Sequence, residues 1–205
     1  MNPLVQFLIQ LLTPNEASAE ILPQTPGSRQ MLQQGLQTPG QGGDIIRALH
    51  ALPQKVNLTD ERGWSEKLSG VGSTSPKAGL GLFRPNLGPG GYNMYVGSPQ
   101  VHQRQGLNLD EVIRTLAHES GHGVAQIAGI GGVKQPTGIG AIDMFANVPG
   151  KRLAVGPNEW LADVLAGIVP KAQAAPETQN QMEQVMQFLR SQQILPQEPL
   201  AQTSQ

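Results

Sequence analysis

Two of the four histidines in this 205-residue chain lie four residues apart, in the stretch HESGH, which holds His118, Glu119 and His122. On an α-helix, residues four apart lie on the same face, so both imidazoles can reach one ion. Zinc binds histidine nitrogen at about 2.1 Å, and a neighbouring carboxylate can accept a proton from zinc-bound water. The spacing therefore predicts a Zn²⁺ site with His118 and His122 as ligands and Glu119 as the catalytic base.

The motif falls within the clearest helix of the sequence, which we expect over residues 109–128. Asn108 suits the N-cap, Glu111 completes a capping box, and Gly129 suits the end of the helix. Apolar residues can bury one side of it: Val112, Ile113, Leu116, Val124 and Ile127. This context favours a metal site over two histidines with ordinary structural roles. Gly121 is unfavourable inside a helix and indicates close packing or substrate approach.

A catalytic zinc usually has three protein ligands, and the candidate for the third is Glu159. It begins a helix expected over residues 158–169, and Asp163 lies four residues later on the same face. There the Asp163 carboxylate can accept the second ring N–H of a zinc-bound histidine. Asp143, in GAID, is an alternative third ligand, although a turn or capping role suits it better. Glu159 could also be an acid that merely favours the helix start, but its pairing with Asp163 supports the ligand role.

The combination of HESGH with the downstream EWLAD resembles the gluzincin branch of the zincin metallopeptidases, over roughly residues 79–170. The resemblance implies a zinc-dependent enzyme that hydrolyses peptide bonds, in proteins or in peptidoglycan peptides. It implies that His118, His122 and Glu159 bind zinc, that Glu119 is general base and acid, and that Asp163 supports a ligand. It also implies an edge strand before the active-site helix that pairs with the substrate. The candidate is YNMYVG, with Tyr92, Met94, Tyr95 and Val96.

Gluzincins usually supply a tyrosine, histidine or arginine that stabilises the developing oxyanion. Tyr92, Tyr95, His102 and Arg152 are the candidates, and their spacing does not choose among them. For each of them, taken singly, a structural or exposed position is the better interpretation.

Composition limits the other classes of function. The formal net charge is -1 with 14% charged residues, which argues against a nucleic-acid binder that works through a basic face. The absence of cysteine excludes disulfides, cysteine-ligated zinc and cysteine nucleophiles. The apolar run at residues 4–12 is expected to form a short helix and is too short to span a bilayer. We therefore expect a soluble protein without a transmembrane segment.

The expected fold is α+β, a compact zincin-like domain with a small mixed or antiparallel sheet packed on the active-site helix. Strands are predicted at residues 79–85 and 92–97, and further helices at 44–52, 59–68 and 177–190. We divide the chain into an N-terminal helix and Gln-, Pro- and Gly-rich arm (1–43), a metallopeptidase domain (44–170), and a C-terminal helix with a polar tail (171–205).

The two arms favour a second hypothesis of another class. The chain could be a structural or adaptor component of a large assembly, such as a phage virion or tail, that retains a zincin fold and lays its arms on neighbouring subunits. A virion-associated peptidase would satisfy both hypotheses. All five site positions are present, which favours a working site.

Overall fold

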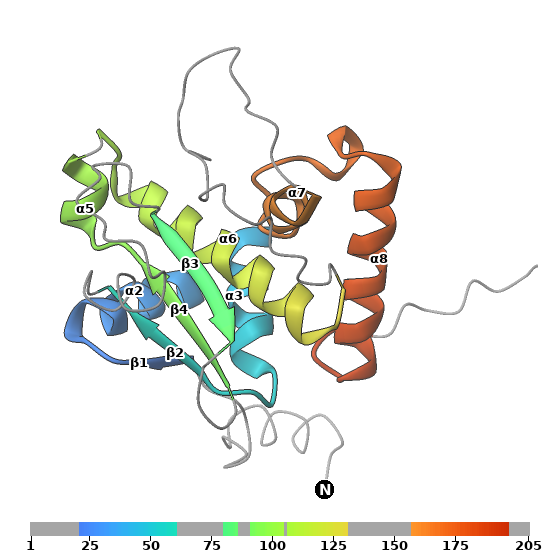
Figure 1. The fold of residues 1–205 in the computed structure, drawn as a ribbon, viewed down its shortest axis with the longest axis horizontal. Coiled ribbons are helices and arrows are strands. Elements are labelled where there is room, and N and C mark those ends of the chain that lie inside the picture. The colour runs from blue at the N-terminus through green and yellow to red at the C-terminus, as the bar shows by residue number, and fades with distance from the viewer. Residues whose placement is uncertain (1–20, 61–79, 86–90, 105, 131–156, 197–205) are drawn as a thin grey trace, which may run out of the picture.

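The computed structural model describes residues 21–60, 80–85, 91–104, 106–130 and 157–196, and the structural statements below concern these residues (Figure 1). They form an α+β fold. Its elements are β1 (Ile21–Pro23), α2 (Pro26–Gln37), α3 (Gln41–Ala51), β2 (Val56–Thr59), β3 (Gly81–Pro85), β4 (Tyr92–Val96), α5 (Pro99–Arg104), α6 (Leu109–Ile127), α7 (Pro157–Leu165), a 3-10 turn (Lys171–Gln173) and α8 (Pro176–Ser191).

The four strands form one mixed sheet in the order β1-β2-β4-β3. Neighbouring strands β1, β2 and β4 pair in parallel, whereas β3 pairs with β4 in the antiparallel direction. The small sheet expected from the sequence is therefore confirmed, as are strands close to residues 79–85 and 92–97. The sequence did not reveal β1 and β2, which are only three and four residues long.

The candidate substrate strand was assigned wrongly. Strand β4, which contains Tyr92, Met94, Tyr95 and Val96, pairs with β2 on one side and with β3 on the other. Both rows of its backbone hydrogen-bonding groups therefore face other strands, and β4 is not an edge. The edge strand next to α6, the helix that carries the HESGH motif, is β3.

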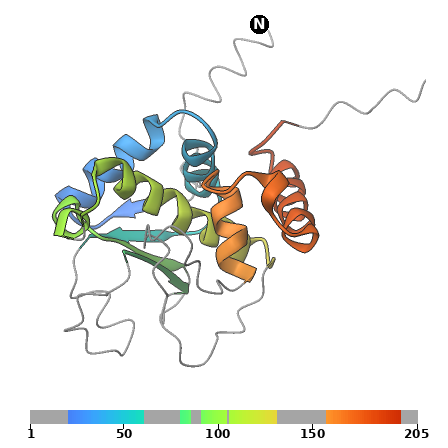
Figure 2. The same cartoon turned by 90° about the horizontal axis from the view of Figure 1, so that it is seen from above.

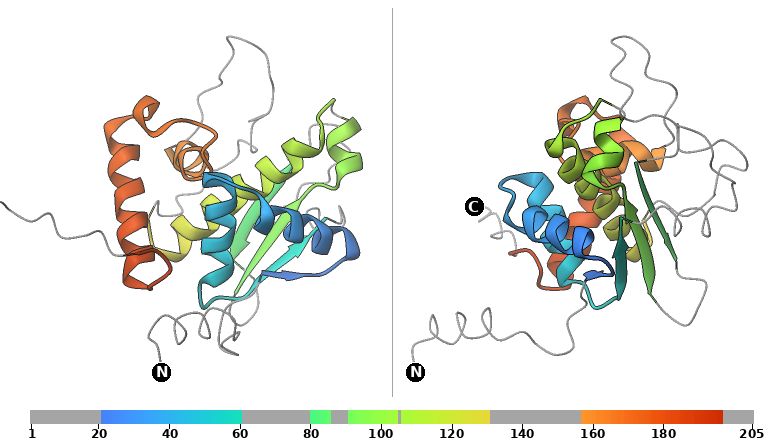
Figure 3. Two further views of the ribbon diagram at one scale, coloured as in Figure 1. Left: turned by 180° about the vertical axis from the view of Figure 1, so that it is seen from behind. Right: turned by 90° about the vertical axis from the view of Figure 1, so that its left-hand side faces the viewer.

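Helices lie on one face of the sheet, as the edge-on view in Figure 3 shows. Helices α2 and α6 contact the strands, and α3 packs against both helices (Figure 2). Side chains alternate between the two faces of a strand, so Val56, Leu58 and Met94 enter the core under the helices. On the opposite face, Asn57 donates a hydrogen bond to Asn93 across the β2–β4 pair.

Residues 26–37, within the segment expected to be an arm, form helix α2. Thr25 caps α2 by a capping box with Ser28, and Pro26 begins the helix. The residues that α2 buries recur at helical spacing, which brings this segment into the core: Ser28, Met31, Leu32 and Gly35. The polar composition suggested an arm because glutamines fill the exposed positions between these buried ones.

The helices predicted at residues 44–52 and 158–169 are present with shifted ends. Helix α3 begins at Gln41, so Asp44 lies in its first turn and pairs with Arg47 instead of capping the helix. Helix α7 ends at Leu165, earlier than expected, because Gly167 adopts φ +71° and the N–H of Ile168 closes on the carbonyl of Asp163. Pro170 is therefore not what terminates α7.

Helix α8 is confirmed, and it extends the core past the second expected boundary at residue 170. Met182, Val185 and Leu189 are buried, and α8 packs against α7 on the side of the molecule away from the sheet (Figure 1). The apolar stripe of α8 therefore docks on this same chain. A single buried cluster includes residues from α2 through α8.

Several sequence-based expectations lie outside the described residues. These are the N-terminal helix at residues 4–12, nearly all of the helix at 59–68, the polar tail from residue 197, and the candidates Asp143 and Arg152. Residues 1–20 and 197–205 are the parts of the two expected arms, 1–43 and 171–205, that lie outside the described residues. Within the described part of the chain, no helix combines the length and the apolar character needed to cross a bilayer.

Candidate metal centre

Helix α6 carries the HESGH motif, and it forms largely as the sequence predicts. The Asn108 side chain accepts a hydrogen bond from the backbone N–H of Glu111, which caps the helix. The expected capping box is only half formed, because Glu111 directs its carboxylate to Arg114. Gly129, with φ +71°, ends the helix. Leu116 and other apolar residues bury the helix against the core, which fixes the face that carries the histidines.

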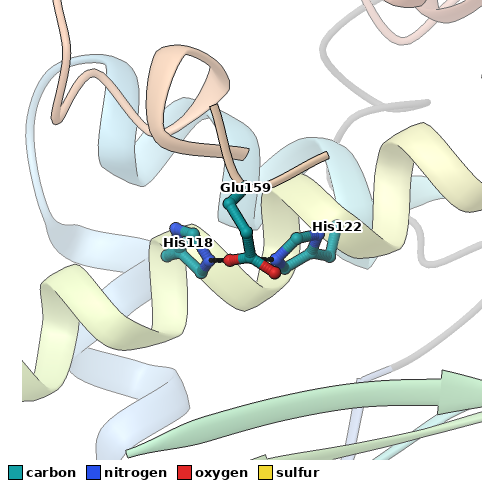
Figure 4. Close-up of side chains that lie close together, drawn as sticks. All are labelled: His118, His122 and Glu159. Atoms are coloured by element: carbon teal, nitrogen blue, oxygen red, sulfur yellow. Dashed lines mark hydrogen bonds and ion pairs between the residues drawn. The ribbon is translucent and has the colours of Figure 1, made fainter. Parts of the chain in front are cut away.

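Three side chains converge on one point, as Figure 4 shows. The Nε2 atoms of His118 and His122 lie 2.9 Å apart, and each lies 3.2 Å from Oε2 of Glu159. Four ligand atoms placed tetrahedrally at about 2.1 Å from a metal lie about 3.4 Å from one another. The three atoms are therefore spaced almost as metal ligands require, and this group can hold a metal ion.

Helix α7 brings Glu159 to the histidines because it crosses α6 very closely. A Cβ atom at Gly121 would lie 2.9 Å from the carbonyl oxygen of Ala162 and 3.1 Å from its Cα. Only glycine permits this approach, so the close packing expected at this position is confirmed. The Gln41 side chain, at the start of α3, donates to the carbonyl of Val164 at 2.6 Å and holds α7 from its other end.

Asp163 lies one turn after Glu159 and contacts the far side of the His118 ring. The distance between Nδ1 of His118 and Oδ1 of Asp163 is 2.9 Å. The His118 side chain is fully buried, and an ionised carboxylate only accepts hydrogen bonds, so Nδ1 carries the proton that is donated to Asp163. When the ring is neutral, this tautomer leaves the Nε2 lone pair directed at the point of convergence, as a metal ligand needs.

The carboxylates of the site favour a positive charge at the point where the three side chains converge. Burial lowers the pKa of His118, but hydrogen bonds to Asp163 and Glu159 outweigh burial and raise the pKa to about 10. Burial raises the pKa of Glu159, but hydrogen bonds from the two histidines outweigh it and hold that pKa well below its ordinary value. Without metal the cluster therefore retains a proton, and a cation that replaces this proton meets ligands already in place.

Glu119 follows His118 directly and is almost completely buried, with 3% of its surface exposed. Burial raises the pKa of its carboxyl, and the nearby Glu159 charge adds to this effect, while the two histidines oppose it. A raised pKa makes the ionised carboxylate a stronger proton acceptor than an ordinary glutamate.

The described candidates for oxyanion stabilisation have other contacts. His102, on α5, is fully buried between the carbonyl of Ser98 and the hydroxyl of Thr115, so both ring nitrogens are occupied. Burial lowers the pKa of His102 although backbone hydrogen bonds with Ser98 and Gly97 oppose this shift, which favours the neutral ring. Tyr92 stacks on Phe83 with ring centroids 5.1 Å apart, and Tyr95 is buried in the sheet. None of the three enters the cluster of metal-ligating atoms.

Comparison with known proteins gives no family assignment. The chain matches no protein-family model, no curated protein and no solved structure. The arguments about its function therefore depend on the geometry and chemistry of the site itself.

We expect Asp163→Asn to weaken zinc binding by about 10- to 100-fold, because asparagine can keep the hydrogen bond to His118 but removes the negative charge behind it. Competition with a chromophoric zinc chelator measures the affinity. Asp44→Asn, which neutralises an exposed carboxylate on α3, is the matched control and should bind zinc as the wild type does. An Asp163→Asn affinity within about twofold of the wild type would contradict the assigned role.

The metal-free protein should lose thermal stability as the pH rises. The pKa of His118 is about 10 in the folded chain and 6.5 in its ordinary state. Protonated His118 therefore stabilises the folded state fully below pH 6.5, and this contribution is lost as the pH rises toward 10. The raised pKa of Glu119 acts in the same direction, because its ionisation disfavours the folded state above the ordinary value of 4.5.

Zinc should reverse this trend, because metal binding requires the histidines to lose protons and is therefore stronger at higher pH. Unfolding midpoints at about pH 6, 7.5 and 9 should fall with chelator present, by a few degrees, and should fall less or rise with zinc present. A metal-free midpoint that rises over this range would show that His118 is not held in its protonated form.

Proposed function

We propose that this protein is a zinc-dependent metallopeptidase of the gluzincin type. One observation carries the proposal: Nε2 of His118, Nε2 of His122 and Oε2 of Glu159 converge within 3.2 Å of one another, while Asp163 holds the other ring nitrogen of His118. Glu159 lies 41 positions after His118 and 37 after His122, so the arrangement requires two separate helices and does not follow from the spacing within one helix.

Zinc and hydrolysis fit this set of residues best. Two imidazoles and one carboxylate bind zinc in catalytic sites and leave the fourth tetrahedral position for water or substrate. Similar donors also bind ferrous iron in oxygenases. The carboxyl group of Glu119, beside the ligands and with a raised pKa, favours hydrolysis, because hydrolysis needs a proton acceptor at this place.

Each residue would have a distinct task in peptide hydrolysis. A bound zinc ion would polarise the scissile carbonyl and make water more acidic. Glu119 would take the proton from the attacking water and deliver it to the nitrogen of the leaving amine. His118, His122 and Glu159 would hold the ion, and Asp163 would keep the His118 ring in the required tautomer and orientation.

The substrate would bind as an extended peptide along β3. This strand pairs with β4 on one side, and none of the described strands pairs with its other side. It also contacts α6, so a peptide added at this edge would pass beside the residues of the motif. Addition of a strand satisfies backbone hydrogen bonds without regard to side chains, so this edge is compatible with protein and peptidoglycan peptides alike.

The direct test of the function is cleavage of a library of internally quenched peptides, together with cell-wall cross-bridge peptides, by the purified full chain. We expect cleavage that is lost after chelation and restored by about one equivalent of zinc per chain. Iron should not restore it. The absence of cleavage by the zinc-loaded protein across both peptide sets would contradict the proposal.

A further inference from the structure

Gly81, at the start of the edge strand β3, lies directly against the Glu119 side chain of α6. A Cβ atom built on Gly81 would lie 2.3 Å from Oε1 of Glu119, 2.6 Å from its Cγ and 2.7 Å from its Cδ. These are the three nearest atoms that such a Cβ would meet, and all belong to Glu119. The side chain of Glu119, the proposed base, therefore occupies the space that a side chain at residue 81 would need.

Position 81 requires glycine because Glu119 leaves no room for a Cβ atom, and not because the backbone adopts a conformation that only glycine favours. Gly81 is not among the glycines with positive φ, so its backbone would accept alanine without strain. It pairs with Val96 of β4, and the N–H of Gly97 donates to the carbonyl of Leu80, which fixes the strand beside α6. The strand backbone therefore cannot easily retreat from an added methyl group.

The Glu119 side chain cannot easily retreat either. The clash involves Cγ, whose position is set by the first side-chain torsion on the helix, and not only the flexible end of the carboxylate. Only 3% of the residue is exposed, so there is little free space into which the side chain can turn. A methyl group on residue 81 would therefore move the carboxylate as a whole.

We propose that Gly81 is a positioning residue that sets where the Glu119 carboxylate lies between α6 and the edge strand. The inference rests on the proposed function, because a position for this carboxylate matters to catalysis only if Glu119 is the base. The three atoms nearest to a Cβ at residue 81 all belong to Glu119 and none to the metal-ligating side chains, so we expect a change at Gly81 to spare metal binding.

The contact is tested by a cycle of single and double variants of the full chain, read by thermal unfolding. Gly81→Ala should lower the unfolding midpoint by at least about 3 °C in the wild type and by less than about 1 °C in a Glu119→Ala background. Alanine at 119 lacks all three atoms of the clash. If Gly81→Ala alone does not fold and the double variant does, the conclusion is the same.

Gly42→Ala is the matched control, because a methyl group there meets only ordinary contacts, at 3.4 Å from the Ala166 carbonyl oxygen and 3.5 Å from the Ala117 Cβ. It should shift the midpoint equally in both backgrounds. Equal losses from Gly81→Ala with and without the Glu119 side chain would overturn the proposal.

Kinetics separate positioning from packing. With the best-cleaved quenched peptide, Gly81→Ala should lower kcat at least about tenfold and leave KM and zinc affinity within about twofold. A raised KM at unchanged kcat, or a matching loss of zinc affinity, would overturn the positioning role. If the wild type cleaves no peptide, the proposed function fails, and the unfolding cycle still decides whether Gly81 sets the position of Glu119.

Discussion

Glu119→Gln is expected to lower peptide cleavage by about 10²- to 10⁴-fold, the usual contribution of a general base, while zinc stays bound. Glutamine has nearly the same shape and fits the same place against Gly81, but its amide cannot accept the proton from water. Because burial already raises the pKa of this carboxyl, a neutral side chain suits the site, and the fold should be at least as stable. The loss should therefore appear in kcat.

The control for this prediction is Glu183→Gln, the same substitution at a half-exposed carboxylate of α8 that pairs with Lys171. It should cleave peptides at the wild-type rate. Zinc content and unfolding midpoint are measured on both variants, so that loss of metal or of fold is not mistaken for loss of the base. Full activity in Glu119→Gln would exclude the assigned role.

His122→Ala is expected to weaken zinc binding by more than about a hundredfold. Loss of a residue that merely supports a ligand costs about 10- to 100-fold, and loss of a ligand itself should exceed that. His122 is the more informative of the two histidines, because 21% of its side chain is exposed whereas His118 is fully buried. Its removal should therefore disturb the site more than the core.

Competition with a chromophoric chelator measures this affinity, with His50→Ala as the control. His50 lies on α3, where its Nδ1 accepts a hydrogen bond from the backbone N–H of Ile21, and it does not belong to the metal-ligating group. Its substitution can lower stability but should leave the zinc affinity unchanged. Equal zinc affinity in His122→Ala and the wild type would remove His122 from the site.

The site could be predicted from the sequence because most of its geometry is local. Helical periodicity places His118 and His122 on one face, and it places Glu159 and Asp163 on one face of the next helix. The structure brings these two pairs together. The close crossing that allows it had a visible signal in Gly121, a residue that is unfavourable inside a helix.

The order of the strands could not be predicted in the same way. Strands 81–85 and 92–96 were both found, but which of them forms the edge depends on β2, a four-residue strand far away in the chain. Strand pairing is not local, and short strands carry little signal of their own. The role of Gly81 was hidden for the same reason, because its contact with Glu119 exists only once β3 is known to be the edge.

The segment that forms α2 was misinterpreted for a different reason. Its composition suggested an arm, yet Thr25 followed by Pro26 is a strong start signal, and Met31, Leu32 and Gly35 follow at helical spacing. The pattern of buried positions was therefore more informative than the overall polarity of the segment.

The most direct test of the metal centre is elemental analysis of the purified full chain after it is loaded with zinc and dialysed. We predict about one zinc ion per wild-type chain and a strongly reduced content in Glu159→Ala, because that variant lacks the carboxylate that joins α7 to the two histidines. A wild-type chain that retains no zinc, or a Glu159→Ala chain that retains it fully, would contradict the three-residue centre on which the proposed function rests.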